Sequence, residues 1–368
     1  MSGKANLDAA KAAKNDEFYT QWSDIENEMQ AYLEYDPDAF RDKVVLLPCD
    51  DPDWSNFTKY FDERFEQLGL KKLISTSCAA DGGSGKVFVL EGENKPQWGY
   101  LAGDGDFRSA EVTALRDEAD VVVTNPPFSL FREFIAWLIE GDVKFSVIGN
   151  MNAVTYKEIF PLIKDNKMWP GIAFNKTMEF AVPAGYYAAK DAELDKYGNR
   201  LVKVPAISWF TNIEHGRRHE PLPLMTMDDN LLYGSKRVRQ TAYPHYDNYD
   251  AIEVPETKGI PSDYAGVMGV PISFLDKYNP DQFEIIGMAK RGAGDPALKT
   301  RVYTAEDYSN YSDLNAGPVI IENGIPRNTY PRILIRHRHL TIQPLSRSRS
   351  GQSSLGCKRG FSHVEVRG

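Results

Sequence analysis

The tetrapeptide Asn125-Pro126-Pro127-Phe128 is the clearest candidate for chemistry in this sequence. Two consecutive prolines fix φ and remove two amide donors, so the backbone there is rigid and presents carbonyl groups. The Asn125 side-chain oxygen and the Pro126 carbonyl therefore form a pair of fixed acceptors, which suits an exocyclic amine with two hydrogens to donate. Phe128 offers a flat surface on which a base can stack. The alternative reading is a tight proline turn with a core phenylalanine.

An alternation of strand and helix patterns surrounds this motif. Short apolar runs bounded by turn residues are typical of buried strands. The expected strands are Val44–Leu47, Lys72–Thr76, Trp98–Ala102, Ala119–Thr124 and Phe145–Gly149. Helices are predicted over Asn56–Leu68, which Gly69 ends, and from a Ser129 cap to Gly141. Another helix is predicted to open with the capping box Ser23–Glu26.

This order predicts an α/β fold around a mostly parallel sheet, because strands that alternate with helices are joined by right-handed crossovers. Ligands bind such sheets beyond the carboxyl ends of the strands. Three loops are therefore expected to form the site: Pro48–Asp53, Gly103–Phe107 and Asn125–Phe128.

The second part of the chain has a different texture. From about residue 216, prolines and tyrosines are scattered and helical periodicity fades, which predicts an irregular α+β region. Its last strand candidate is Arg332–Ile335. The residues after it are rich in Ser, Arg and Gly without a usable period, so they are expected to be disordered. The predicted division is 1–215, 216–338 and 339–368.

Composition narrows the class of protein. The 368 residues are 42% hydrophobic, but no run of about 18 apolar residues occurs, so a membrane-spanning helix is not expected. The first residues lack the apolar stretch of a secretory signal, and three scattered cysteines do not suggest a disulfide scaffold, so a cytoplasmic location is predicted. The net charge of −9 decides nothing about nucleic acid, because residues 331–368 carry eight basic residues and one acid.

Three other patterns carry weaker signals. Gly82–Lys86 resembles a phosphate-binding loop, but no Ser or Thr follows the lysine and a strand pattern comes next, so a hairpin turn is expected. His215 and His219 have a metal-like spacing without further Cys or His nearby, so no metal site is predicted. Trp209–Asn212 is either a buried strand or part of the wall of a target pocket.

Five strings of residues carry a resemblance to a known family. They are KNDEFYTQWSDIENE, VVLLPCDDPDWSNFTKYF, GDGDFRS, VVVTNPPFSLFREF and PRILIR. NPPF resembles the catalytic motif of amino-methyltransferases that use S-adenosylmethionine, and the strings in this order resemble the EcoRI-type adenine-specific DNA methyltransferases. The resemblance extends from Lys14 to Arg338. It implies a Rossmann-like class I methyltransferase core, followed by an irregular α+β target-recognition region.

The resemblance also implies roles for particular residues. Asn125 and Pro126 would hold the amino group of the target adenine, and Phe128 would stack on its ring. The cofactor contacts that it implies are Asp16, Phe18, Tyr19 and Thr20, then Pro48, Cys49, Asp50 and Asp51, then Asp104, Asp106 and Phe107, together with Asn125. One carboxylate of the 50/51 pair would meet the cofactor's amino group, and one of the 104/106 pair its adenine. The loop that contains Pro48 to Asp51 lacks the glycines usual in wider methyltransferases, and a solvated turn is the alternative reading for Asp104 and Asp106.

Duplex DNA is the partner that the resemblance implies. The basic residues that could contact it are Arg217, Arg218, Lys236, Arg237 and Arg239. Tyr243, Tyr246 and Tyr249 follow closely, a composition that suits phosphate and base contact, although a solvated charged face is the alternative.

The predicted activity is sequence-specific methylation of adenine N6, on a base flipped out of duplex DNA, without a metal. A monomer is expected to do this for restriction–modification or protection of self DNA, alongside a cognate endonuclease. Two alternatives remain: an amino-methyltransferase that acts on RNA or on a protein amide, and a catalytically silent DNA-binding homologue.

Overall fold

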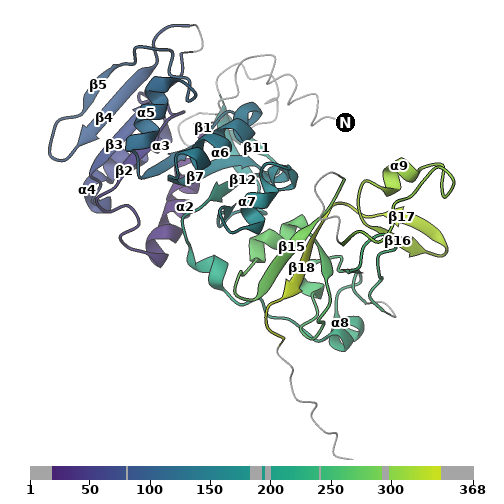
Figure 1. The fold of residues 1–368 in the computed structure, drawn as a ribbon. Coiled ribbons are helices and arrows are strands. Elements are labelled where there is room, and N and C mark those ends of the chain that lie inside the picture. The colour runs from purple at the N-terminus through teal and green to yellow at the C-terminus, as the bar shows by residue number, and fades with distance from the viewer. Residues whose placement is uncertain are drawn as a thin grey trace, which may run out of the picture.

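The chain folds around two main sheets. The computed structural model describes residues 19–79, 82–182, 193–194, 200–239, 242–291 and 298–340. Figure 1 shows the larger sheet in the N-terminal part and a smaller one in the C-terminal part. Residues 341–368, which make up nearly all of the predicted disordered tail, lie outside the described residues, as do Asp16 and Phe18. Within the described residues, no helix is long and apolar enough to span a membrane.

The larger sheet contains eight described strands. They are β2 (Val44–Leu47), β3 (Lys72–Thr76), β4 (Lys86–Glu91), β5 (Gln97–Tyr100), β6 (Val121–Thr124), β7 (Lys144–Asn150), β8 (Trp169–Pro170) and β12 (Ile207–Thr211). Their order across the sheet is β5-β4-β3-β2-β6-β7-β12-β8. The four central strands β3, β2, β6 and β7 are parallel, as predicted. Because β4 and β12 run antiparallel to their neighbours, the sheet as a whole is mixed rather than mostly parallel in its pairings.

Helices cover both faces of this sheet. They are α2 (Trp22–Tyr35), α3 (Asn56–Glu63), α4 (Phe65–Leu68), α5 (Ala110–Glu118) and α6 (Phe131–Glu140). Successive side chains of a strand point to opposite faces, so Val44 and Leu46 pack with α5 and α6, whereas Val45 and Leu47 pack with α2, α3 and α4. The result is a three-layer arrangement in which both faces of the central strands are buried, whereas the edge strand β5 is exposed.

Several helix boundaries differ from the sequence-based prediction. The predicted capping box is wrong, because α2 begins at Trp22 and Ser23 and Glu26 lie inside the helix. The Ser129 cap is also wrong: the diproline corner leads first into a 3-10 turn, Phe128–Leu130, and α6 begins only at Phe131. The helix predicted over 56–68 is interrupted at Arg64, although Gly69 ends it in the left-handed conformation as expected.

The C-terminal part is built from short elements. Its sheet has the order β13-β14-β18-β15. The strands are β13 (Ile252–Glu253), β14 (Met268–Pro271), β15 (Phe283–Ala289) and β18 (Arg332–His337), and β16 (Val319–Glu322) forms a hairpin with β17 (Ile325–Asn328). The helical elements are η3 (Gly216–His219), α8 (Met227–Tyr233), η4 (Thr257–Gly259), η5 (Ile272–Lys277) and α9 (Tyr311–Leu314). The predicted strand Arg332–Ile335 is therefore confirmed within β18.

The two parts share one hydrophobic core. Side chains of the C-terminal sheet, including Met288 and Ile333, belong to the same buried cluster as Val147 of β7. Two helical elements of the N-terminal part, η2 (Met151–Thr155) and α7 (Phe160–Lys164), also contribute to this cluster, and α7 packs against β15. The small sheet is therefore anchored on the α5–α6 side of the large one.

A third, smaller sheet pairs the start of the described chain with strands from residues 178–204. Its order is β1-β9-β11-β10. The strands are β1 (Tyr19–Thr20), β9 (Met178–Val182), β10 (Glu193–Leu194) and β11 (Arg200–Val204). Through it, the predicted N-terminal cofactor segment is paired with β9.

Candidate active site

A buried carboxylate joins the loop after β2 to the end of β6. Asp50 is only 5% exposed, and its carboxylate accepts hydrogen bonds from Ser55 Oγ at 2.8 Å and from Thr124 Oγ1 at 2.6 Å. Its backbone is tied to β3, since the amide donates to the Thr76 carbonyl at 2.9 Å and the Ser75 hydroxyl donates to the Asp50 carbonyl at 2.7 Å. Because Thr124 directly precedes Asn125, Asp50 fixes the start of the NPPF motif.

Asp51 is in a different environment from its neighbour. Its carboxylate accepts a hydrogen bond at 2.9 Å from the ammonium group of Lys86, which also pairs with Asp53. The hydrogen bonds to Asp53 and Asp51 raise the pKa of Lys86 above its usual range. Of the two candidate aspartates, Asp50 therefore has its carboxylate engaged within the protein interior, and Asp51 belongs to a more exposed charge cluster.

The loop after β5 packs tightly on the end of β3. The Ala79 amide donates to the Asp104 carbonyl at 2.7 Å. Gly105 has a φ of +84°, and a Cβ atom there would collide with the Ser77 carbonyl, so only glycine permits this approach. Cys49, in the loop after β2, lies near residues of the other two loops. Burial raises the pKa of its thiol, and Asp50, Cys78 and Asp106 raise this pKa further. The loops after β2, β3 and β5 therefore meet at one edge of the sheet.

The side chains of this third loop have separate environments. Asp106 forms an ion pair with Arg108 at 2.6 Å, and the hydrogen bonds from Arg108 lower the pKa of the Asp106 carboxyl. Asp104 is exposed, and its Oδ1 accepts from the Asp106 amide at 3.0 Å. Phe107 is buried, with its ring 4.9 Å from that of Phe134. Of the three predicted cofactor contacts here, Asp104 is the most accessible side chain.

The NPPF motif lies at the carboxyl end of β6. Asn125 is partly exposed, and its Oδ1 atom is shielded from solvent. Pro126 is buried, and the carbonyl of Pro127 accepts the amide of Leu130 at 2.9 Å, which closes the turn into α6. Phe128 is half-buried and packs against the hydrophobic cluster on the α2–α3 side of the sheet. The motif is thus held on both sides, and Asn125 and Phe128 are each partly exposed, with the side-chain oxygen of Asn125 on the shielded side.

The N-terminal segment approaches the same edge. Tyr19 and Thr20 form β1, and the Asn56 side chain donates to the Thr20 carbonyl at 2.8 Å. Asn56 is the first residue of α3, the helix that follows the Pro48–Asp53 loop. The structure therefore brings two of the predicted cofactor segments together, with Asn56 as a link that the sequence did not reveal.

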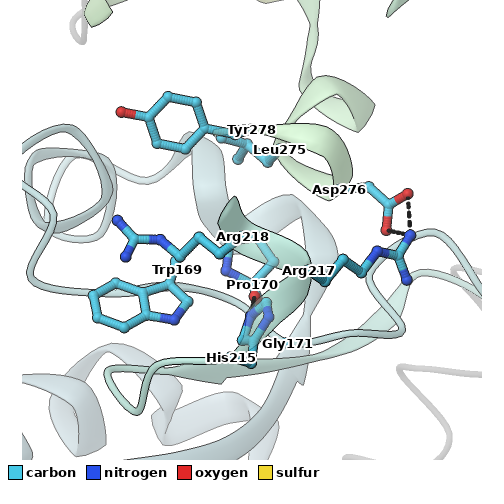
Figure 2. Close-up of a pocket in the computed structure, with 9 residues that line it drawn as sticks. All are labelled: Trp169, Pro170, Gly171, His215, Arg217, Arg218, Leu275, Asp276 and Tyr278. Atoms are coloured by element: carbon cyan, nitrogen blue, oxygen red, sulfur yellow. Dashed lines mark hydrogen bonds and ion pairs between the residues drawn. The ribbon is translucent and has the colours of Figure 1, made fainter. Parts of the chain in front are cut away.

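Two of the predicted DNA contacts are engaged within the protein. Figure 2 shows Arg217 directed to Asp276, and its Nη2 atom donates to both carboxylate oxygens of Asp276, at 2.8 and 2.7 Å. The guanidinium of Arg218 lies 3.8 Å from the ring centre of Trp169 and donates to Glu214 at 2.8 Å. Arg218 is 6% exposed, and this burial lowers the pKa of its guanidinium. Arg217 also donates to the carbonyl of Ile172, so its side chain links the N-terminal part to Asp276 of η5 in the C-terminal part.

The other three predicted DNA contacts are on the surface. Lys236, Arg237 and Arg239 are exposed and follow α8, whereas Val238 between them is buried. Leu232 and Tyr233, at the end of α8, are 64% and 75% exposed. This segment therefore combines positive charge with exposed apolar side chains.

The weaker sequence patterns have structural explanations. Gly82–Lys86 leads into β4, which pairs antiparallel with β3, so the predicted hairpin is confirmed. Trp209 to Thr211 lie in the fully buried strand β12, with Asn212 directly after it. The imidazole of His215 contacts the Pro170 carbonyl at 3.1 Å, and that of His219 contacts Glu214 at the same distance.

The family described as adenine-specific methyltransferase EcoRI matches residues 6–338. The chain belongs to this family. It is 47% identical over 305 residues to the Type II methyltransferase M.EcoRI of Escherichia coli. The aligned region covers 77% of this chain and 89% of that protein. It is 39% identical over 337 residues to the Type II methyltransferase M.MpnI of Mycoplasma pneumoniae. That alignment covers 90% of this chain and 98% of that protein. No solved structure matches the chain.

The predictions of family, enzyme class and adenine-specific DNA methylation are confirmed at the level of the family. The family match ends at residue 338, where the predicted tail begins. The roles of individual site residues, the domain boundaries, the endonuclease partner, the monomeric state and the cytoplasmic location stay predictions.

Proposed function

We propose that this family member transfers a methyl group from S-adenosylmethionine to the N6 amino group of an adenine in duplex DNA. The observation that carries the proposal is the hydrogen bond between Asp50 and Thr124, which locks the loop after β2 to the NPPF motif after β6. These two loops follow the adjacent strands β2 and β6. The first contains predicted cofactor contacts, and the second contains the predicted catalytic residues.

The strand order supports a ligand site at this edge, as in a Rossmann-like fold. The chain passes from β2 to β3 on one side and then returns to β6 and β7 on the other side of β2. The order of strands therefore reverses between β2 and β6. In open α/β sheets, ligands bind outside the carboxyl ends of the strands at such a reversal.

The side chains at this edge fit the cofactor's chemistry. The methionine end of S-adenosylmethionine carries an ammonium and a carboxylate, and Asp51 and Lys86 offer the complementary charges 2.9 Å apart. The exposed Asp104 can accept from the adenine amino group. Asp50 is assigned to holding the site together, because its carboxylate already accepts from two buried hydroxyls.

The NPPF motif would act on the target base. When bound, S-adenosylmethionine supplies a methyl group made electrophilic by its positively charged sulfur. The Asn125 oxygen and the Pro126 carbonyl would accept the two hydrogens of the adenine amino group, which orients the nitrogen lone pair. Because these acceptors fit a pyramidal nitrogen better than the planar ground state, they favour the transition state. The nitrogen would gain the methyl group as the sulfur–methyl bond of the cofactor breaks, which would leave a neutral thioether, and one proton would pass from the nitrogen to solvent.

Phe128 would receive the flipped base. Extrusion of a base from a duplex costs a few kcal/mol. The half-buried ring of Phe128 is held in place by the core cluster and offers a stacking surface that offsets part of this cost. Lys236, Arg237 and Arg239 would contact DNA phosphates from the C-terminal part. Arg217 and Arg218 would instead hold the two parts of the enzyme in register.

Methyl transfer from labelled S-adenosylmethionine to mixed-sequence duplex DNA tests this proposal. We expect the label in N6-methyladenine after the DNA is digested to nucleosides. Label in RNA or in a protein amide, with unlabelled DNA, would assign the enzyme a different substrate. Failure to bind the cofactor at all would instead indicate a silent homologue.

A further inference from the structure

A basic hollow lies between the NPPF helix and the C-terminal sheet. Four of the residues that line it are cations, namely Arg132, Lys157, Lys290 and Arg291. Its lining also includes Tyr156 and a single acid, Glu158, so the hollow carries an excess of positive charge. These residues come from three separate stretches of a chain whose overall charge is −9.

The elements that supply these residues place the hollow at the proposed catalytic edge. Arg132 is in the first turn of α6, directly downstream of the NPPF motif. Tyr156 and Lys157 follow η2, which begins where β7 ends, and β7 lies parallel to β6. Lys290 and Arg291 follow β15 of the C-terminal sheet. The hollow therefore adjoins the motif and is bordered by both parts of the protein.

Two of the lining cations are held by hydrogen bonds within the protein, and the other two are exposed to solvent. The Lys290 ammonium donates to Thr155 Oγ1 at 3.0 Å, and Arg291 donates to Ser312 Oγ at 3.2 Å, which holds the C-terminal side in place. Arg132 and Lys157 are 58% and 77% exposed. Both share the Glu158 carboxylate at 3.8 Å, a loose contact that a stronger anion can replace.

We propose that this hollow binds the phosphate backbone of the target DNA beside the flipped adenine. The inference rests on the proposed function, and it adds a phosphate-binding site at the junction of the two parts. A guanidinium and an ammonium on one wall match phosphate oxygens, because both groups are cationic hydrogen-bond donors. Contacts at this position would register the DNA over Asn125 without reading its sequence.

The double variant Arg132→Ala/Lys157→Ala tests the site, with Lys71→Ala/Lys95→Ala as the matched control. Lys71 precedes β3, at the opposite end of the strands from the motif, and Lys95 lies in the turn between β4 and β5. Duplex affinity is measured over a series of salt concentrations. We expect the slope of log affinity against log salt to fall by about 2 for the site variant, since each lost phosphate contact removes about 0.9. The control should keep the wild-type slope.

Two further readouts separate this site from a structural role. The site variant should keep the wild-type affinity for S-adenosylmethionine and the wild-type thermal unfolding temperature. Its affinity should fall equally for duplexes of different sequence, because phosphate contacts carry no sequence information. An unchanged salt slope in the site variant would overturn the inference, even if the wild type forms N6-methyladenine. Absence of N6-methyladenine with the wild type would contradict the proposed function itself.

Discussion

The carboxyl edge of the large sheet and the segment after α8 use polar side chains in opposite ways. At the carboxyl edge of the large sheet, Asp50, Ser55 and Thr124 are buried and bonded to one another. In the C-terminal part, Lys236 and Arg239 extend from the surface. Chemistry requires atoms held in fixed positions, whereas attraction of a polyanion requires only charge at the surface. We propose a division of labour, with catalysis at the edge of the large sheet and part of the DNA affinity in the exposed segment after α8.

The basic stretch predicted from the sequence divides along the same line. Arg217 and Arg218 are close in sequence to Lys236, but their guanidinium groups contact Asp276, Glu214 and Trp169. These pairs are partly or fully buried at the junction of the two parts. Removal of one partner from such a pair leaves the other charge unpaired, so these arginines are expected to matter for stability.

Among the variants that test this division of labour, Asn125→Ala is expected to change the rate of methyl transfer most. In Asn125→Ala, methyl transfer should fall by about 10²–10³-fold, as when one preorganised hydrogen-bonding group is removed from an active site. Affinities for S-adenosylmethionine and duplex DNA should remain near those of the wild type. Single-turnover transfer and equilibrium binding measure the two properties. A variant that transfers at a near-normal rate would remove Asn125 from the mechanism.

The buried clamp on the sheet should matter for both folding and catalysis. Asp50→Ala leaves the Ser55 and Thr124 hydroxyls without this acceptor, which should lower the free energy of unfolding by about 2–6 kcal/mol. Thr124→Val removes only the link to the motif and should cost less stability while still slowing transfer. Urea unfolding and single-turnover transfer measure both. If Thr124→Val transfers normally, the clamp does not position Asn125.

A buried acid on α2 gives the N-terminal part a dependence on pH. Burial raises the pKa of Glu28 from its usual 4.5 to about 7, against hydrogen bonds from Tyr32 and Ile172 that lower it. Between these two values the folded protein binds more protons than the unfolded chain, so stability falls as pH rises. The shift corresponds to about 3 kcal/mol at 1.36 kcal/mol per pKa unit.

The Glu28→Gln variant isolates this effect because its amide cannot ionise. Its stability relative to the wild type should increase as pH rises from about 4.5 to 7, and the increase should stop above that range. Urea unfolding at a series of pH values gives the comparison. Parallel stability curves for the two proteins would show that Glu28 does not titrate in this way.

The sequence predicted the sheet edge well because its signals are local. Val44–Leu47 and the strand before Asn125 are apolar runs ended by turn residues, and both are strands in the structure. The motif also carries its own rigidity in two prolines. The helix starts were predicted less well, since the 3-10 turn after Pro127 depends on how the diproline corner meets α6.

The remaining features depend on contacts that are distant in the sequence. The different environments of Asp50 and Asp51 follow from Thr124 and Lys86, which no local pattern connects to them. The basic hollow adds Lys290 of the C-terminal part to Arg132 and Lys157 of the N-terminal part, and no local sequence pattern connects these residues. The distribution of charge along the sequence therefore could not predict the hollow. The same charge pattern predicted a surface position for Arg218, which is buried.

The division of labour is tested most directly by measuring DNA affinity and single-turnover methyl transfer side by side in two variants. One is Asn125→Ala, and the other is Lys236→Ala/Arg237→Ala/Arg239→Ala. The first should lose transfer and keep duplex affinity. The second should lose affinity, with a salt slope smaller by about 3, and regain the wild-type rate at saturating DNA. If both properties fall together in both variants, catalysis and DNA affinity are not divided between the two parts.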